Sequence, residues 1–169
     1  MAVLDINPQF ERVLALLEER RESVFITGKA GTGKSTLLEH FCQKSGNKPV
    51  VLAPTGVAAL NVKGQTIHSF FNFYIDVTPE KVRSKKIKPR SPQIYKAIKT
   101  IIIDEISMVR ADVFDTIDRF LRKFGPTSKQ PFGGVQMVLM GDLCQLPPVV
   151  KSEEAGYFSS FYETPFFFS

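Results

Sequence analysis

Residues 23–36 read SVFITGKAGTGKST, and this stretch decides the fold. The first five residues form a short apolar run of the kind that makes a buried strand. The next nine are rich in glycine, lysine and hydroxyl side chains. Because glycine loses the most backbone freedom on ordering, this composition disfavours the interior of a strand or a helix. The stretch therefore predicts a strand that runs directly into a specialised loop.

The loop fits the phosphate-loop pattern G-x-x-x-x-G-K-[ST] in full from Gly28 to Ser35. Its glycines let backbone N–H groups approach phosphate oxygens, and the helix that follows offers unpaired N–H groups and a positive dipole end. We expect Lys34 to reach the β- and γ-phosphates, Ser35 to bind Mg²⁺, and Thr36 to lie beside the α-phosphate. The expected nucleotide-binding residues of the loop are Gly28, Ala30, Gly31, Thr32, Gly33, Lys34, Ser35 and Thr36.

Apolar runs and helical patterns alternate along the rest of the chain. The apolar runs cover residues 23–27, 49–53, 100–104 and 135–142. The helical patterns cover residues 8–17, 34–45, 55–62 and 112–124. Continuous apolar strands that alternate with helices are typical of a parallel sheet with both faces covered. We therefore expect an α/β fold in a single domain that spans residues 1–169.

Composition limits the class of protein. With 169 residues and an apolar fraction of 43%, the chain can build a core without disulfides or metals. No apolar run approaches the length of a membrane span, and the first ten residues lack the pattern of a secretory signal. Cys42 and Cys144 lack metal-ligand spacing, and Cys144 is most simply a small buried side chain. We expect a cytoplasmic protein, or a nucleoid or nuclear one, without a membrane segment.

Two acidic residues end the apolar run IIID. Asp104 and Glu105 fall at the carboxyl end of a predicted strand, where open parallel sheets bind their ligands. Asp104 can hold Mg²⁺ opposite Ser35, and Glu105 can orient and deprotonate an attacking water. Adjacent acids also occur in solvated turns, but the phosphate loop in the same chain favours the catalytic interpretation. A glutamate here favours hydrolysis over phosphate transfer to a second substrate.

The last predicted strand runs into LMGDLCQLPPV, residues 139–149. Gln145 can touch the γ-phosphate and report its loss, although spacing alone favours a loop glutamine that faces water. Asp142 can support Mg²⁺ or a neighbouring loop. Pro147 and Pro148 stiffen the exit, because each fixes its own φ.

Five motifs in this order resemble those of superfamily 1 DNA helicases: GKAGTGKST, APTGVAAL, TIHSFF, IIIDEISMV and PFGGVQMVLMGDLCQLPPV. The similar branch is the petite-integration-frequency (PIF) family, related to RecD, and the resemblance covers nearly the whole chain. It implies a three-layer RecA-like domain with a mainly parallel sheet, in which the strand before Gly141 lies between the other two motif-bearing strands. It also implies ATP and Mg²⁺ as cofactors, 5′ to 3′ translocation, and work in DNA repair, recombination and telomere maintenance.

The resemblance assigns further residues. Gln9 matches the family glutamine that reads the adenine edge, a role suited to an amide that both donates and accepts. The same resemblance supports Gln145 as the γ-phosphate sensor, so the expected catalytic residues are Lys34, Glu105 and Gln145. Residues 53–71 look like the family's strand-contacting motifs, which implies single-stranded DNA as a partner. The implied DNA-binding residues are Pro54, Thr55, Gly56, Thr66, His68 and Ser69.

Some aromatic and basic residues keep alternative interpretations. His68 also fits an interior histidine, and Phe70 and Phe71 fit the core better than a base stack. Residues 74–99 form an irregular basic segment that we read as a surface insertion. Within it, residues 81–99 contain no acid, and their basic residues are Lys81, Arg83, Lys85, Lys86, Lys88, Arg90, Lys96 and Lys99. A solvated face and contact with the DNA backbone are equally open for this segment.

Family members continue into a second RecA-like domain whose arginines complete the ATP site, and this chain stops at Ser169. Arg110, Arg119 and Arg122 match no arginine finger, and such an arginine is worth roughly 10³–10⁵ in rate. We therefore expect a monomeric first motor domain that binds Mg-ATP and hydrolyses it weakly. The aromatic ending PFFFS calls for a partner surface. The alternatives are an ATP-responsive DNA-binding module without unwinding activity and, less compatible with the five motifs, a nucleotide or small-molecule kinase.

Overall fold

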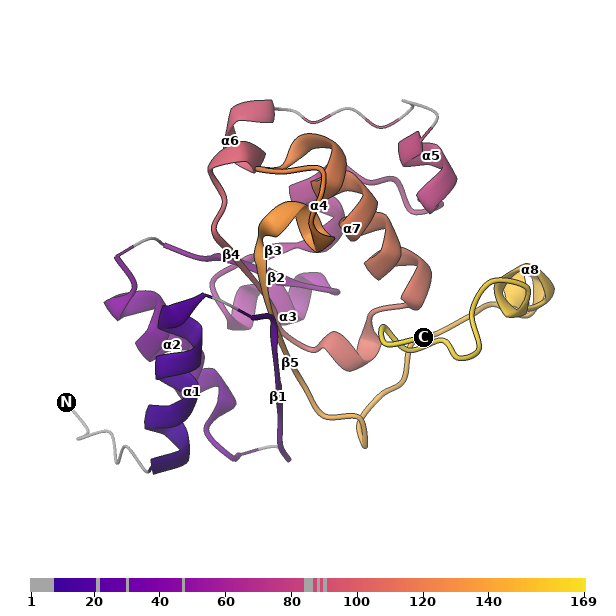
Figure 1. The fold of residues 1–169 in the computed structure, drawn as a ribbon. Coiled ribbons are helices and arrows are strands. Elements are labelled where there is room, and N and C mark those ends of the chain that lie inside the picture. The colour runs from indigo at the N-terminus through magenta and orange to yellow at the C-terminus, as the bar shows by residue number, and fades with distance from the viewer. Residues whose placement is uncertain are drawn as a thin grey trace.

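The structure is a computed structural model that describes residues 8–20, 22–29, 31–46, 48–83, 87, 89 and 91–169 (Figure 1). The strands are β1 (Val24–Thr27), β2 (Val50–Ala53), β3 (Gln65–Thr66), β4 (Thr100–Ile103) and β5 (Gln136–Gly141). The α-helices are α1 (Pro8–Glu19), α2 (Lys34–Lys44), α3 (Gly56–Asn61), α4 (Ile67–Phe71), α5 (Pro79–Arg83), α6 (Pro92–Ala97), α7 (Ala111–Phe124) and α8 (Ala155–Ser159). Short 3₁₀ turns are η1 (Ile106–Met108), η2 (Pro131–Gly134) and η3 (Ser152–Glu154).

The strands form one parallel sheet in the order β1-β5-β4-β2-β3. The register places Val138 of β5 opposite both Val24 of β1 and Ile102 of β4. The expected α/β fold is therefore confirmed, including the position of β5 between β1 and β4. The four apolar runs became β1, β2, β4 and β5, whereas the two-residue β3 was too short to leave a pattern.

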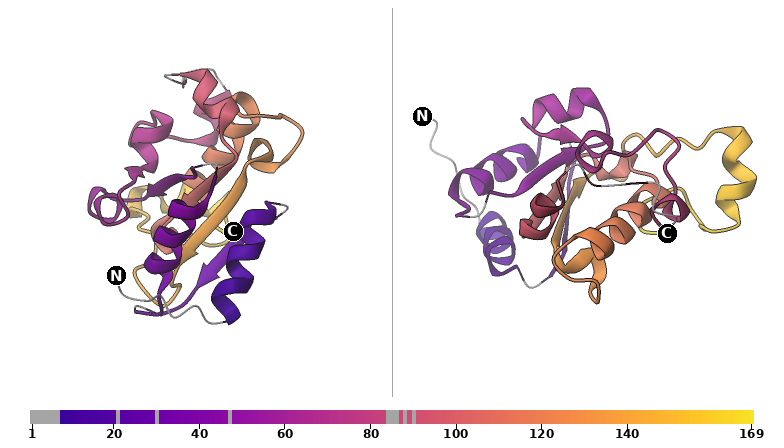
Figure 2. Two further views of the ribbon diagram at one scale, coloured as in Figure 1. Left: turned by 90° about the vertical axis from the view of Figure 1, so that its left-hand side faces the viewer. Right: turned by 90° about the horizontal axis from the view of Figure 1, so that it is seen from above.

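Helices cover both faces of this sheet, so the molecule has three layers (Figure 2). On one face, Ile102 packs with Leu38 and Phe41 of α2, and α1 lies beside them. On the other face, Ile101 and Ile103 join a larger cluster with α7 and the helices α4 to α6. Successive side chains of a strand point to opposite faces, so the run Ile101–Ile103 supplies both clusters in alternation, while the buried Thr100 hydroxyl donates to the Gln136 side chain at 3.1 Å.

The segment 74–99 contributes to the core, although we expected a surface segment. It holds α5 and α6, and the buried side chains are Val77, Val82, Ile87, Tyr95 and Ile98. The Tyr95 hydroxyl donates to the carbonyl of Phe70 at 2.6 Å, and its ring lies 4.9 Å from that of Phe120. Apolar residues among the lysines thus close one end of the larger cluster. Lys85, Lys86, Lys88 and Arg90 lie outside the described residues.

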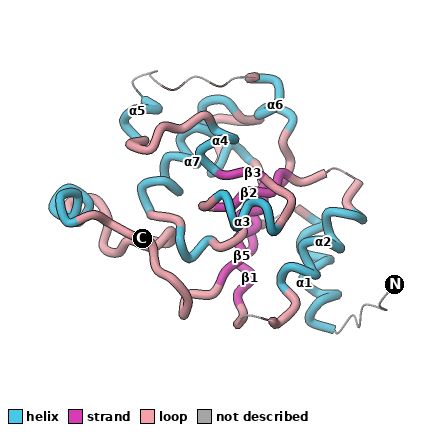
Figure 3. The backbone as a smooth tube through the Cα atoms, turned by 180° about the vertical axis from the view of Figure 1, so that it is seen from behind, coloured by secondary structure: helices cyan, strands magenta, loops and turns pink. Residues whose placement is uncertain are grey.

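The aromatic tail finds part of its partner surface within the chain. Phe167 is only 8% exposed, with its ring 5.4 Å from that of Phe25 and 5.7 Å from that of Phe114. The Ala111 N–H donates to the carbonyl of Pro165 at 2.9 Å, which fixes the returning backbone. Before this return the chain passes through α8, which projects from the body of the domain (Figure 3).

Across the described ranges, the structure contains no helix with the length and apolar character of a membrane span.

Candidate functional site

The phosphate loop joins β1 to α2, as the sequence predicts. Gly31 and Gly33 have φ values of 79° and 89°, a left-handed backbone that favours glycine. Helix α2 begins immediately afterwards, and the Leu37 N–H donates to the Gly33 carbonyl at 2.9 Å. The first turn of α2 therefore directs its unpaired N–H groups toward the loop. Ala30, also assigned to this loop, lies outside the described residues.

Main-chain oxygens of the loop hold the side chain of Lys34. Its ammonium donates to the carbonyl of Gly28, and to that of Lys29 at 3.0 Å. The Thr32 hydroxyl donates to the same Lys29 carbonyl at 2.8 Å. The loop thus places a cation beside the start of α2, and the cation and the helix end together favour a phosphate group.

Two carboxylates follow β4, next to the phosphate loop. Burial raises the pKa of Asp104 above its ordinary value, although the Lys34 ammonium acts in the opposite direction. Burial and the nearby charge of Asp104 raise the pKa of Glu105 as well, again against Lys34, and Asp142 adds to the rise. β1, β5 and β4 are parallel neighbours, so the loops that carry these four charged groups leave the same edge of the sheet. A raised pKa suits Glu105 for taking a proton, because a general base works best with a pKa near the working pH.

Glu105 has an unusual backbone conformation. Its φ and ψ are 52° and 42°, the left-handed region, which costs a residue with a side chain roughly 1–2 kcal/mol. Gly141, at the end of β5, lies close to the two residues that follow Glu105. A Cβ atom at Gly141 would lie 3.2 Å from the backbone nitrogens of both Ile106 and Ser107. The loop that carries Glu105 therefore rests directly against the end of β5.

Asp142 organises the loop after β5 and orients Gln145. Its buried carboxylate accepts the Cys144 N–H at 3.0 Å and the Gln145 side-chain amide at 3.2 Å. Of the two roles open to Asp142, support of a loop is the one its hydrogen bonds fulfil. Cys144 is exposed rather than buried, because the chain leaves the core after Asp142.

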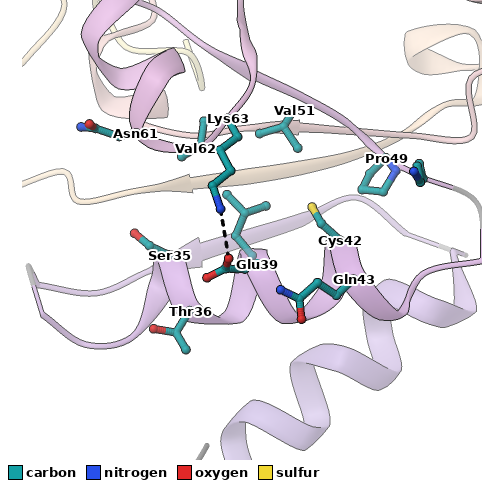
Figure 4. A pocket seen from close by; sticks show the side chains of 12 residues that line it. Ser35, Thr36, Glu39, Cys42, Gln43, Pro49, Val51, Asn61, Val62 and Lys63 are labelled. Atoms are coloured by element: carbon teal, nitrogen blue, oxygen red, sulfur yellow. Dashed lines mark hydrogen bonds and ion pairs between the residues drawn. The ribbon is translucent and has the colours of Figure 1, made fainter. Parts of the chain in front are cut away.

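Other predicted nucleotide contacts lie on helix termini. Gln9 is exposed in the first turn of α1, and Ser35 and Thr36 are exposed in the first turn of α2. Beside them, a cleft of about 420 Å³ runs between α2 and two other parts of the chain, the start of β2 and the end of α3, with Ser35 and Thr36 at one end (Figure 4). An ion pair of 3.4 Å between Lys63 and Glu39 crosses the cleft. No sequence pattern indicated this cleft, because it forms between distant segments.

The predicted strand-contacting residues gather where β2 and β3 end side by side. Thr55 caps α3 and Thr66 caps α4, each accepting an N–H from three residues further on at 3.2 Å. Gly56, Thr66 and Ser69 line one shallow hollow of about 520 Å³. Pro54 lies partly buried at the end of β2. The structure therefore brings the two predicted motifs to one surface.

His68 is placed apart from that hollow. It is half-buried, and its ring lies edge-on to Phe73 with 6.4 Å between centroids. Burial lowers its pKa below the ordinary value despite the charge of Asp112. Phe71 is fully buried and Phe70 packs against the same core, which confirms the core interpretation of both.

The three arginines near α7 form ion pairs within the chain. These pairs are Arg110 with Asp112 and Glu154, Arg119 with Asp115, and Arg122 with Asp118. Each side chain thus already has a carboxylate partner on its own domain.

Comparisons with known proteins extend these observations. The family model for PIF1-like helicases matches residues 7–161. The ATP-dependent DNA helicase PIF1 of Emericella nidulans is 38% identical over 148 residues, which cover 82% of this chain and 20% of that protein. The ATP-dependent DNA helicase RRM3 of Saccharomyces cerevisiae is 38% identical over 154 residues, covering 85% and 21%. The chain therefore spans about a fifth of the length of these relatives.

Solved structures give the same result in three dimensions. A Pif1 helicase from Bacteroides in complex with ADP-AlF3 and ssDNA matches with a TM-score of 0.89 and 42% identity, covering 98% of this chain and 39% of that chain. Bacteroides Pif1 bound to ssDNA matches with a TM-score of 0.88 and 42% identity, covering 98% and 38%. These matches confirm the RecA-like α/β fold.

Proposed function

Because the chain belongs to the PIF1-like helicase family, we propose that it is the ATP-binding motor domain of an ATP-dependent DNA helicase. One observation carries the proposal: β1, β5 and β4 are parallel neighbours, so the loops that carry Lys34, Asp104 and Glu105, and Gln145 all leave the same edge of the sheet. Phosphate-loop NTPases use such a set to bind and hydrolyse a nucleotide. The printed names of the relatives, ATP-dependent DNA helicases, support DNA as the polymer on which the domain acts.

Each residue of the site has a defined task in this proposal. The loop N–H groups and Lys34 bind the phosphates, and Gln9 pairs with the adenine edge. Glu105 orients the attacking water and accepts its proton, while Gln145 donates its amide to the γ-phosphate. The Ser35 hydroxyl and the Asp104 carboxylate fit Mg²⁺, which prefers oxygen ligands and takes only one or two carboxylates from a protein. When bound, Mg²⁺ neutralises charge on the β- and γ-phosphates.

Single-stranded DNA is the proposed polymer partner, followed 5′ to 3′ at the hollow between α3 and α4. The hydroxyls of Thr55 and Thr66 accept helix N–H groups, which leaves their hydrogens to donate to a phosphate oxygen. Pro54, Gly56 and Ser69 complete this surface, and His68 supports it from the side of Phe73. Such an enzyme works where DNA is, in the cytoplasm and nucleoid or in a nucleus.

A second candidate is an ATP-responsive DNA-binding module without unwinding activity. It is favoured by the ion pairs of Arg110, Arg119 and Arg122. Because each of these arginines at or near α7 binds a carboxylate of the same domain, none of the three serves the γ-phosphate in this structure. On this basis the chain as a monomer binds Mg-ATP and hydrolyses it weakly, and a second RecA-like domain supplies the remaining arginines.

The test measures nucleotide and DNA binding by fluorescence anisotropy, and steady-state hydrolysis with and without single-stranded DNA. We expect Mg-ATP binding that is lost in Lys34→Ala, together with binding of an oligonucleotide. Failure of the chain to bind a nucleotide would refute the proposal. DNA-stimulated turnover at 1–100 s⁻¹, typical of complete phosphoryl-transfer sites, would refute the weak hydrolysis.

A further inference from the structure

Arg110 joins three separate parts of the domain. Its guanidinium binds Asp112 through two hydrogen bonds, from Nε at 3.0 Å and from Nη2 at 2.8 Å. The remaining fork nitrogen, Nη1, donates to Glu154 at 2.8 Å, and the group lies 5.4 Å over the ring of Phe158. The backbone of Arg110 also forms a β-bridge with Phe166. One side chain therefore fixes the start of α7 to both η3 and α8.

The connection from Glu105 to Arg110 is short and rigid. The Met108 N–H donates to the Glu105 carbonyl at 3.0 Å, and the Val109 N–H donates to the Ile106 carbonyl at 2.9 Å. Ile106 is fully buried and Val109 is 3% exposed. Close-packed segments of this kind shift as units, so a displacement at Glu105 is passed to Arg110.

The connection from Gln145 to Glu154 has a different character. The loop after β5 is held at its start by Asp142, but most of the following side chains up to Lys151 are exposed. Pro147 and Pro148 stiffen this stretch, because each fixes its φ. Within the part of the chain that the structure describes, the next side-chain hydrogen bond after that of Gln145 is the one that Glu154 accepts from Arg110.

β4 and β5 are neighbours, so the loops that carry Glu105 and Gln145 leave the same edge of the sheet. Beyond the site, the Arg110–Glu154 bond joins the segments that continue from these two loops. We propose that Arg110 is a positioning residue. By binding Glu154, it joins the segment that follows Glu105 to the segment that follows Gln145, and so sets the position of Gln145 relative to Glu105. The inference rests on the proposed nucleotide site, and it makes γ-phosphate recognition depend on an ion pair outside that site.

The decisive variant is Glu154→Ala, which removes the far anchor and leaves the Arg110–Asp112 pair intact. Kd values for Mg-ATPγS and Mg-ADP are measured on the whole chain by displacement of a fluorescent ADP. We expect the preference for the triphosphate to fall by roughly 2- to 30-fold, the range for residues that couple sites, with Kd for ADP unchanged. Glu153→Ala is the matched control, because this exposed neighbour on η3 is expected to leave both values as they are.

A double-mutant cycle with Gln145→Ala then tests the route of the effect. If Glu154 acts through Gln145, the double variant loses no more discrimination than Gln145→Ala alone. Additive losses, or equal weakening of ADP and ATPγS, would show a merely structural role and overturn the inference. An unchanged preference in Glu154→Ala would do the same. If the unsubstituted chain binds neither nucleotide, the proposed function fails first and the inference fails with it.

Discussion

Replacing Glu105 by glycine is expected to stabilise the protein while removing the proposed proton acceptor. The left-handed backbone at φ 52° costs a side-chain-bearing residue about 1–2 kcal/mol, and glycine adopts it freely. Glycine loses about 0.5–1 kcal/mol more in backbone freedom on folding, which leaves a net gain of about 0.5–1 kcal/mol. Loss of repulsion from Asp104 and Asp142 acts in the same direction. For a chain of this size the melting temperature should rise by roughly 1–4 °C.

Thermal and urea unfolding measure this gain, with Lys63→Gly as the matched control. Lys63 has the same φ of 52°, and its ion pair with Glu39 is exposed and worth under about 1 kcal/mol. We expect Lys63→Gly to melt no lower than the parent protein and both variants to retain Mg-ATP binding, whereas only Glu105→Gly loses residual hydrolysis. If Glu105→Gly melted at a lower temperature than the parent protein and Lys63→Gly did not, the assignment of strain to Glu105 would be refuted.

Three further predictions concern packing and pH. Gly141→Ala should destabilise the fold by about 1–3 kcal/mol in urea unfolding, because its Cβ meets backbone atoms, whereas Gly156→Ala in α8 has open space and should be neutral or better. Phe167→Ala should cost about 3–5 kcal/mol, and Phe168→Ala, whose side chain is 57% exposed, much less; equal costs would mean that the tail is not docked. The raised pKa of Glu105 means that the folded state binds this proton more tightly than the unfolded state does. Its contribution to stability is therefore complete below about pH 4 and is lost as the pH rises through the raised pKa. The stability of Glu105→Gln relative to the parent should accordingly increase from pH 4 to 7, and a flat difference would contradict the shift.

The strands and the phosphate loop could be predicted because their signals are local. A run such as IIID can be satisfied only between two covered faces, and the spacing of Gly28, Gly33 and Lys34 has a direct chemical reason. The burial of Val77, Val82, Ile87, Tyr95 and Ile98 was missed because these apolar side chains follow no regular period. Likewise, the docking of Phe167 depends on Phe25, which lies more than 100 residues away in the sequence.

The candidate site divides in the same way. Residue types at a strand end indicated Asp104 and Glu105, since parallel strands bring their carboxyl ends to one edge, whereas Gln145 was assigned through the family resemblance. The left-handed conformation of Glu105 was not predictable, because glutamate has no preference for this region of the backbone. The roles of Arg110 and of the cleft beside α2 also arise from contacts between segments, which no single motif encodes.

The order of strands in the sheet also has a consequence for how the chain acquires its structure during synthesis. Among the strands of the described residues, β1 has only β5 as a neighbour, and the paired residues Val24 and Val138 lie more than 100 residues apart. At translation rates of about 5–20 residues per second, β1 waits roughly 6–20 s on the ribosome for its partner. The phosphate loop is thus synthesised early, but the strand that leads into it gains its partner strand late. Until β5 emerges, β1 is an unpaired apolar segment. During this period the nascent chain is most exposed to aggregation, and binding by a chaperone would protect it most.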